Sequence, residues 1–597
     1  MNPSLTQEQA GETLLGGRAL QSLASLRRLI AAHHAETVSI CLLFIMSVNM
    51  LTAVARKSIT NDEIVHIPAG YYHLVAGNYT LNNEHPPLIK MWAALPLLFI
   101  QPNEPALETS GKSHFAERTA SAYDNFWAAN DEFFQPICFW TRASMILLAA
   151  LLGWLIFVYA RRLAGARAAV LAVALYSLEP TVLAHGRVVH TDLPAAFAYL
   201  LFFFALHGYV KEPTLRRAAF LGAVTGAALI TKFSLAILAP VFAVACLIHM
   251  WRAPRLGRSR AMVLRHATLA ALIALFIINA AYRFQRQALL QADVAWVTLK
   301  TPERFDEVMT GIAVLSKFVP TYFLFGIYNV GIHNHYGHAA SIFGEHSYTG
   351  WWYYFPAAFA LKTTIPFLLF SAAALAWGVW RLAAKRDWRF LFLVIPVAIY
   401  AALSLSSTIN IGIRHFLPVY PFLFVLGGML LHAALRPRRA KLLARPLVVL
   451  LLCWVSFEAL RAYPDYTPYM NQLAWKRPAW QYLSDSNVEW GDDVPALAAY
   501  LRARGETKVR AALAGGWMTL DHYGVTYINI FSSTRKRLPE TNYVAIGASF
   551  LNGATVPASL EESQNMPEKE RQNFFAHFRD QKPEAVFGNS IYLYRVK

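Results

Sequence analysis

The chain has 597 residues, of which 56% are hydrophobic and only 15% are charged. Soluble domains carry about 25% charged residues, so this composition excludes an ordinary soluble protein. The formal net charge of +18 would suit a nucleic-acid partner. However, the basic residues gather in short connections between apolar runs, where they indicate membrane topology. We therefore expect the lipid bilayer, and no nucleic acid, as a partner.

Apolar runs near the length that crosses a bilayer, about 20 residues, recur along the chain. Eleven are candidate transmembrane helices: residues 38–56, 140–160, 168–185, 193–210, 217–232, 234–251, 265–282, 356–379, 389–406, 416–434 and 446–461. We expect them to form a membrane domain at 38–462, after a cytoplasmic segment at 1–37. Two large outer loops, 57–139 and 283–355, belong to this domain.

The remaining residues, 463–597, have a mixed polar composition. The segments KVRAALAG, NYVAIGAS and AVFGNSIYLYRV are typical of strands. We therefore predict a C-terminal soluble α/β domain. The expected fold class is a polytopic α-helical membrane protein with about 11 transmembrane helices, two large outer loops and this soluble domain.

The short connections between the predicted spans alternate in charge. Twenty Lys or Arg residues lie in five of them, at 161–167, 211–217, 251–265, 381–389 and 436–445. The intervening connections hold one each: Arg187, Lys232 and Arg414. Because basic loops stay in the cytoplasm, this alternation predicts a multi-pass plasma-membrane protein with a cytoplasmic N-terminus and an extracytoplasmic C-terminal domain.

Two apolar segments in the outer loops are candidates for helices that lie along the membrane surface. The run LIKMWAALPLLFI at 88–100 is too short to span, so we expect an interfacial helix there. Residues 312–330 have the same character in the second outer loop. The EHPPL element before the first helix fits a stiff turn, and this is the structural alternative to a role in substrate binding.

Four polar features fall at predicted outer helix ends or in short outer connections. They are Asp62-Glu63, the run from Arg187 to His190-Thr191-Asp192, Lys232, and Arg414-His415. The topology brings all four to one side of the membrane. Because topology favours cations on the inner side, and cations near a span are costly, this convergence of carboxylates and cations indicates a functional site.

Each feature also has a structural interpretation. Lys232 and Arg414 would fit snorkelling anchors at helix ends. Asp62-Glu63 would fit a solvated helix cap, and Asp192 would fit the cap of the next helix. The run HNHYGH at 333–338 has no standard zinc spacing, so we predict no metal there and no required cofactor.

The convergence points to one kind of chemistry. Cations suit a phosphate or diphosphate held at the membrane surface, and carboxylates suit the removal of a proton from an acceptor hydroxyl. Together they describe group transfer from a lipid-linked phosphate donor on the outer side. A carboxylate of the Asp62-Glu63 pair would have to escape full neutralisation, and burial or a like charge would raise its pKa toward a useful value.

The motifs also follow one another in a familiar order. Asp62-Glu63 precedes NNEHPPL, LAHGRVVHTDLP, TKFS and NIGIRHFLPVYPF, with GEHSYTGWWYYFP and YLSDSNVEWGDDVPALAAYL further along. This order resembles bacterial members of the protein O-mannosyltransferase-like family, glycosyltransferase family 39. The family belongs to the GT-C class of polyprenyl-phosphate-sugar-dependent enzymes, which includes the aminoarabinose transferases of lipid A. The resemblance covers most of the chain and implies a bacterial inner membrane, with a periplasmic C-terminal domain.

The resemblance implies roles for individual residues. Asp62 matches the general base, with Glu63 beside it, and Asp192 matches the second acidic position. We expect the carrier phosphate to contact Lys232, Arg414, His415 and Arg187, and the substrate to contact Glu84, His85 and His190. His85 stands where related enzymes often have a cation, and the β-trefoil insertion of eukaryotic members is missing. These departures put protein O-mannosylation in doubt.

The predicted reaction is an inverting transfer of mannose or a related hexose or pentose to an acceptor hydroxyl. The acceptor is a protein, a lipid or a glycan, and the sequence does not choose among them. Two alternatives stay open: a lipid or solute transporter or flippase, and a non-catalytic envelope assembly protein. A transporter would favour repeated halves and polar groups near the membrane midplane, whereas these polar groups gather at one face.

Overall fold

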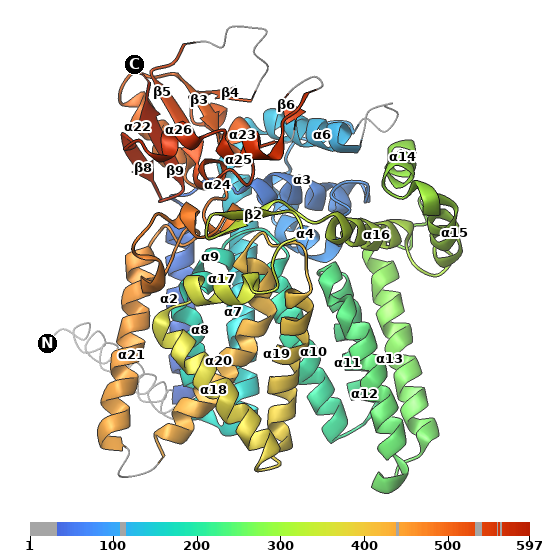
Figure 1. Ribbon diagram of the computed structural model, residues 1–597. Helices are drawn as coiled ribbons and strands as arrows, with labels where there is room; N and C mark the ends of the chain where they lie inside the picture. The colour runs from blue at the N-terminus through green and yellow to red at the C-terminus, as the bar shows by residue number, and fades with distance from the viewer. Residues whose placement is uncertain are drawn as a thin grey trace, which may run out of the picture.

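The computed structural model describes residues 33–107, 115–436, 441–531, 540–557, 559–560 and 564–596. A bundle of long helices forms one end of the molecule, and a sheet from the C-terminal part lies at the other (Figure 1). The predicted cytoplasmic segment 1–37 falls outside the described residues except for 33–37.

Eight helical segments among the described residues are long and apolar enough to cross a membrane. They are His34–Val54 (α2), Asp131–Ala164 (ending in α7, Phe134–Ala164), Asp192–Lys211 (α10), Phe233–Arg252 (ending in α12, Leu238–Arg252), Arg260–Ala281 (α13), Ile365–Ala383 (α18), Trp388–Leu405 (ending in α19, Leu391–Leu405) and Ile413–Ala434 (ending in α20, Tyr420–Ala434). The other three predicted positions hold α8 (Ala166–Leu178) with α9 (Pro180–His185), α11 (Leu215–Leu229) and α21 (Lys441–Ala462). A multi-pass helical membrane protein is confirmed, and the count of eleven spans stays a prediction.

Two of the predicted spans are broken at prolines. Pro180 separates α8 from α9, and Pro366 lies in the first turn of α18, just after the short helix α17 (Tyr354–Lys362). Proline lacks the N–H that continues a helix and disfavours helical backbone in the residue before it. Glu179 ties the two breaks together, because its carboxylate accepts hydrogen bonds from the Thr364 N–H at 3.1 Å and from the Thr364 hydroxyl at 2.8 Å.

Glycines allow two pairs of helices in the bundle to pack backbone against backbone. A Cβ on Gly222 of α11 would lie 2.4 Å from the Ala270 carbonyl oxygen of α13. A Cβ on Gly428 of α20 would lie 2.4 Å from the Ala168 carbonyl oxygen of α8. Lipid tails are as apolar as the side chains, so membrane helices associate through this close contact rather than through the hydrophobic effect.

Shorter helices cover the end of the bundle that faces the sheet. They are α3 (Asn61–Val75), α4 (Pro87–Ala94), α5 (Leu97–Ile100), α6 (Phe115–Ala129), α14 (Gln291–Lys300), α15 (Phe305–Leu315) and α16 (Thr321–Tyr336). In Figure 1, α3 and α16 lie across the bundle end. The predictions of helix at 88–100 and 312–330 are confirmed, and each helix is interrupted, at Pro96 and before Pro320. A small hairpin, β1 (Ala340–Ile342) with β2 (Glu345–Ser347), follows α16.

The C-terminal part contains a five-stranded sheet with the strand order β4-β3-β5-β9-β8. Its strands are β3 (Lys508–Ala512), β4 (Thr526–Asn529), β5 (Tyr543–Gly547), β8 (Ala585–Phe587) and β9 (Ile591–Arg595). β3 runs parallel to β4 and β5, whereas β9 is antiparallel to β5 and β8. The three strand predictions are confirmed. The helices include α22 (Val494–Arg502), α23 (Gly516–His522) and α24 (Ala548–Asn552), so the α/β character is also confirmed. The limits of the predicted domains stay a prediction.

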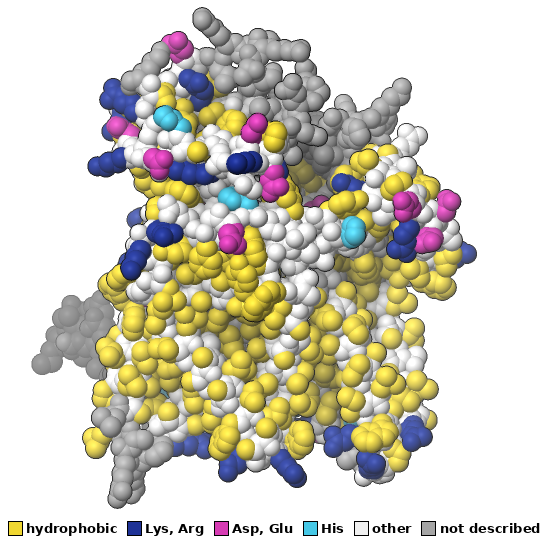
Figure 2. All heavy atoms as spheres, in the orientation of Figure 1, with side chains coloured by type: hydrophobic (Ala, Val, Ile, Leu, Met, Phe, Trp, Pro, Cys, Tyr) yellow, Lys and Arg dark blue, Asp and Glu magenta, His cyan; other side chains and the backbone are white. Residues whose placement is uncertain are grey.

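The kinds of side chain on the surface change along the long axis of the bundle. Hydrophobic side chains cover the bundle in a broad band, and Lys and Arg side chains gather at its far end, away from the sheet (Figure 2). This is the arrangement that the alternating charge of the connections predicts for a cytoplasmic end.

Candidate active site

A cavity of about 780 Å³ lies where the bundle end meets the C-terminal part. Seven of the ten predicted site residues line it: Asp62, Glu84, His85, Asp192, Lys232, Arg414 and His415. The opposite wall comes from the C-terminal part and includes Asp485, Glu489, Trp490, Trp517, Tyr527 and Phe531. The cavity therefore joins residues that are up to several hundred positions apart in the sequence.

Asp62 enters the cavity from the first turn of α3. The start of this helix is held by Glu63, whose Oε2 accepts a hydrogen bond from the Thr60 N–H at 2.7 Å. Asp62 forms an ion pair with Arg414, and its Oδ1 accepts a hydrogen bond from the Trp490 indole at 3.2 Å. Its side chain is 19% exposed, so it is reachable from the cavity.

The pKa of Asp62 differs from the sequence expectation. Burial raises the pKa of this carboxyl, but the Arg414 guanidinium, His66 and the hydrogen bond from Trp490 outweigh burial and hold the pKa below its usual range. The expected rise in pKa is therefore wrong for Asp62. The reason is that Arg414, the cation predicted to bind the carrier phosphate, forms an ion pair with Asp62.

The second acidic position, Asp192, lies at the start of α10 between several basic groups. It pairs with Lys232, and its Oδ2 lies 3.9 Å from Arg414 and 3.0 Å from His190 Nδ1. The His190 Nε2–H donates to the His185 carbonyl oxygen at 2.8 Å, which fixes the ring. His190 is fully buried and does not line the cavity, so the structure gives it a contact with Asp192 rather than with a substrate.

The loop that carries Glu84 and His85 faces the same cavity. Lys90, 1% exposed, supports this loop by donating hydrogen bonds to the carbonyl oxygens of Asn82 and His85, each at 2.8 Å. Asn82 has a left-handed backbone with φ of 49°, which is uncommon outside glycine and helps turn the loop.

The two titratable groups of this loop have opposite tendencies. Although the Glu84 side chain is exposed to the cavity, the surrounding protein desolvates it and Asp62 repels its charge, so its pKa is raised. Burial, His66, Lys232 and Lys90 all lower the pKa of His85 well below its usual value. His85 is therefore neutral near pH 7 and does not replace the missing cation.

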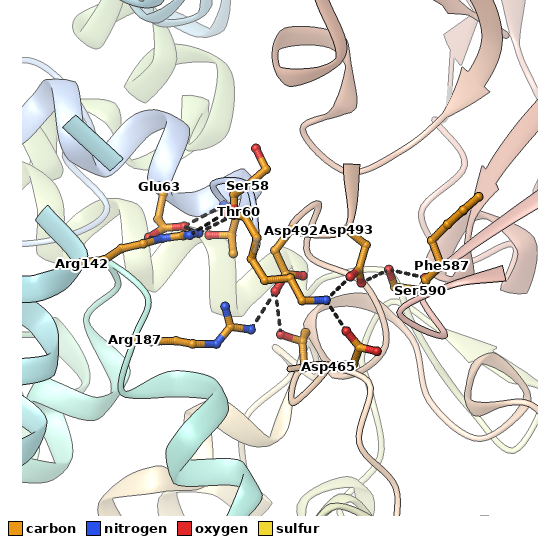
Figure 3. A network of polar contacts seen from close by, with 12 residues as sticks. Ser58, Thr60, Glu63, Arg142, Arg187, Asp465, Asp492, Asp493, Phe587 and Ser590 are labelled. Atoms are coloured by element: carbon orange, nitrogen blue, oxygen red, sulfur yellow. Dashed lines mark hydrogen bonds and ion pairs between the residues drawn. The ribbon is translucent and has the colours of Figure 1, made fainter. Parts of the chain in front are cut away.

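Two of the predicted residues are engaged elsewhere. Glu63 is fully buried against Arg142, with Oε1 2.8 Å from Nε and Oε2 2.6 Å from Nη2. Arg187 is fully buried and donates to Asp492 at 2.8 Å. Neither lines the cavity, and both belong to the buried charge network in Figure 3. The structure thus does not bring Glu63 or Arg187 to the cavity.

Sequence reasoning also missed residues that contact the site. Trp490 touches both Asp62 and Arg414, and Lys90 supports the Glu84 loop. The only signal for Trp490 was its place in the family-like run SDSNVEWGDD. Within the ranges that the structure describes, no group of three His, Cys, Asp or Glu side chains could hold a metal ion, although His333 and His338 line the cavity with ring nitrogens 3.0 Å apart.

Comparison with known proteins gives one family match and several similar structures. No curated protein matches the chain. Two crystal structures of ArnT from Cupriavidus metallidurans, one bound to undecaprenyl phosphate and one in the apo state, are each 13% identical to it. They cover 93% and 94% of this chain and 97% and 98% of theirs, each with a TM-score of 0.46. The Archaeoglobus fulgidus oligosaccharyltransferase in complex with Zn and sulfate is 13% identical, over 86% of this chain and 68% of its own, with a TM-score of 0.40.

The family match lies in the membrane half of the chain. Residues 139–282 match the family model described as dolichyl-phosphate-mannose-protein mannosyltransferase. This stretch holds Asp192 and Lys232, which line the cavity. The match supports a membrane glycosyltransferase with a polyprenyl-phosphate donor, and it confirms over residues 139–282 the resemblance that the motifs predicted.

Proposed function

We propose that the protein is a membrane glycosyltransferase that moves a single sugar from a polyprenyl-phosphate carrier to an acceptor hydroxyl on the extracytoplasmic side. The observation that carries this proposal is one cavity lined by Asp62, Asp192, Lys232 and Arg414 at the end of the apolar bundle. A phosphate needs cations, and an attacking hydroxyl needs a base. The cavity offers both at the level where a lipid carrier presents its head group.

Arg414 is the residue on which the mechanism depends. It is paired with Asp62, lies 3.9 Å from Asp192, and has its guanidinium 4.6 Å from the centre of the Trp490 ring. We propose that the carrier phosphate takes over the guanidinium when it binds beside Lys232. Asp62 then loses its closest cation, and its pKa rises toward the value that a general base requires.

The transfer step is a single displacement with inversion at the anomeric carbon. The acceptor oxygen forms a bond to this carbon while its proton passes to an Asp62 carboxylate oxygen. The bond between the anomeric carbon and the phosphate oxygen breaks, and its electron pair leaves with the phosphate. Arg414 and Lys232 stabilise the negative charge that develops there.

The other cavity residues fit binding roles in this scheme. Glu84 and His85 face the cavity from the loop before α4, where they are suited to hold sugar or acceptor hydroxyls. The wall from the C-terminal part presents Trp517, Tyr527 and Phe531, which suits an acceptor that packs through uncharged surface. We propose mannose or a related hexose or pentose as the sugar, and a protein, lipid or glycan as the acceptor.

The test uses the full chain in lipid nanodiscs. Radiolabelled polyprenyl-phosphate sugars would be supplied with an envelope extract, and label reaching an acceptor would be counted for the wild type and for Asp62→Asn. Asp306→Asn, at an exposed position on α15 outside the cavity, is the matched control. We expect transfer by the wild type and the control, and a loss of about 100-fold or more in Asp62→Asn.

Other outcomes would revise the proposal in a defined way. Full transfer by Asp62→Asn together with no transfer by Glu84→Gln would move the base role to Glu84, whose pKa is raised. Movement of the labelled lipid across the bilayer with no new sugar–acceptor bond would reject the transferase and favour a flippase.

A further inference from the structure

The run SDSNVEWGDD, residues 484–493, has no role in the proposed reaction, yet it reaches the centre of the site. We call these residues the docking segment. It lies just before α22, so it belongs to the C-terminal part by sequence. Ser484, Ser486, Asn487, Glu489, Trp490, Asp492 and Asp493 are all buried.

The docking segment forms backbone contacts on both sides of the cavity. On one side the Asn61 N–H donates to the Trp490 carbonyl oxygen at 2.8 Å, next to Asp62. On the other side the Ile413 N–H donates to the Asn487 side-chain oxygen at 2.9 Å, next to Arg414. The segment therefore fixes the residues that precede the proposed base and the proposed phosphate ligand.

The Trp490 side chain lies between these two residues. Its indole N–H donates to Asp62 Oδ1 at 3.2 Å, and the Arg414 guanidinium lies over its ring at 4.6 Å. The rings of His185 and His190 contact the same indole, with centroids 5.6 and 5.5 Å away. Trp490 is 3% exposed, so these contacts hold it in one position.

Buried charges anchor the end of the docking segment. Asp492 accepts from Arg187, which lies at the turn before Asp192. Asp493 pairs with Lys57 and accepts from Ser590, in the turn that joins β8 and β9. Figure 3 shows Asp492 and Asp493 between Arg187 on one side and Ser590 on the other. The segment is thereby tied to the membrane half and to the sheet at once.

We propose that the docking segment completes the catalytic centre, and that Trp490 is a positioning residue that holds Asp62 and Arg414 in reacting geometry. This inference rests on the proposed function for its catalytic meaning. The structural part of the inference, that the Trp490 indole orients Asp62 through a hydrogen bond, does not depend on the proposed function. The indole N–H orients one carboxylate oxygen and leaves the other for Arg414 or an incoming proton.

The charged and titratable groups that face Asp62 come from several elements. They are Arg414, His66, Glu84 and His85, with Asp192 beyond Arg414. Trp490→Phe leaves all of them in place and removes only the N–H donor and one ring. A hydrogen bond to a carboxylate lowers its pKa. Its loss must raise the pKa of Asp62 and move the acid limb of kcat/KM to higher pH.

The first experiment compares pH profiles of transfer in nanodiscs. We expect Trp490→Phe to lower kcat/KM about 10-fold and to move its acid limb upward by about half a pH unit or more. Trp475→Phe, at a position that is 66% exposed, is the matched control and should change neither. A lower rate with an unmoved limb would overturn the positioning role.

The second experiment needs no activity. A double-mutant cycle with Trp490→Phe and Asp62→Ala would be read from thermal unfolding midpoints. Coupling is expected, because Trp490→Phe should cost less once Asp62 is gone. Additive midpoints would reject the inference. If the wild type transfers no sugar but the cycle shows coupling, the proposed function fails and the positioning contact stands.

A third measurement covers the case in which Trp490→Phe does not fold. Indole N–H signals of the ¹⁵N-tryptophan-labelled full chain would be compared between the wild type and Asp62→Ala. One signal must shift when its acceptor is removed. Identical spectra from folded protein would overturn the proposal.

Discussion

The adjacent acids Asp62 and Glu63 should behave in opposite ways when each loses its charge. The Glu63 side chain is fully buried and accepts hydrogen bonds from Arg142, from the Thr60 N–H and from the Val189 N–H at 2.9 Å. Glu63→Gln keeps the shape of the side chain but leaves the fully buried Arg142 without its counter-ion. Breaking one partner of a buried pair costs about 3–5 kcal/mol.

This free energy can be measured as a change in the thermal midpoint. For a chain of this size it corresponds to a fall of roughly 2–4 °C, read by scanning fluorimetry at one fixed heating rate. Glu307→Gln is the matched control, because Glu307 pairs with Arg304 at the surface, where the two side chains are 68% and 74% exposed. Such surface pairs contribute about 0–1 kcal/mol. The control should therefore leave the midpoint almost unchanged.

Sugar transfer distinguishes the two roles. Below its midpoint Glu63→Gln should retain transfer within about 10-fold of the wild type, because Glu63 does not line the cavity and contacts Arg142 and the backbone N–H groups of Thr60 and Val189 instead. Asp62→Asn should show the reverse, with little loss of stability and a severe loss of transfer. An unchanged midpoint together with abolished transfer in Glu63→Gln would refute this reasoning and return Glu63 to the catalytic residues.

Three further predictions concern the cavity. Arg414→Lys keeps the charge but loses the planar guanidinium that reaches Asp62, Asp192 and the phosphate. We therefore expect kcat/KM for the donor to fall about 10- to 100-fold. An unchanged kcat/KM would contradict a bidentate role for Arg414. Because Arg414 keeps the pKa of Asp62 below its usual value in the free enzyme, the activity that requires ionised Asp62 is lost only at low pH. The acid limb of kcat/KM should therefore lie below that of kcat, and coincident limbs would argue against the exchange of Arg414 to phosphate. Lys90→Met removes a donor from two loop carbonyl oxygens: that of Asn82 keeps only the His85 N–H at 3.3 Å, and that of His85 loses the Lys90 donor, at about 1–3 kcal/mol for the unpaired oxygen. The variant should lower kcat through the Glu84 loop, and Lys317→Met on the exposed surface is its control in the same assay.

Hydropathy and loop charge were enough to predict the gathering of Asp62, Asp192, Lys232 and Arg414. Asp62 follows the first apolar helix by a few residues, and Asp192, Lys232 and Arg414 lie at or beside the ends of apolar helices. The topology of apolar helices follows from their length and from the charges beside them. Hydropathy and loop charge predict the first and last residues of individual helices less well. The apolar run continues across Pro180 and therefore suggests one unbroken helix, although proline interrupts the helical hydrogen bonds there.

The roles of Glu63, Arg187 and Trp490 could not be predicted because tertiary contacts decide them. Neighbours on a helix point about 100° apart, so Asp62 faces the cavity while Glu63 faces Arg142. Arg187 meets its partner Asp492 only when the C-terminal part packs on the bundle. The pKa of Asp62 depends in the same way on Arg414, which lies 352 positions away in the sequence.

The docking segment also determines how modular this chain is. A hybrid that exchanged everything after α21, which ends at Ala462, would place foreign side chains opposite Lys57 and Arg187, whose present partners are Asp465, Asp493 and Asp492. A junction placed after Asp493 would keep these partners and transfer only the sheet with its helices. The part that can be exchanged thus begins after the buried ion pairs and not at the edge of the membrane. Recombination among related chains would be tolerated after Asp493 and not after Ala462.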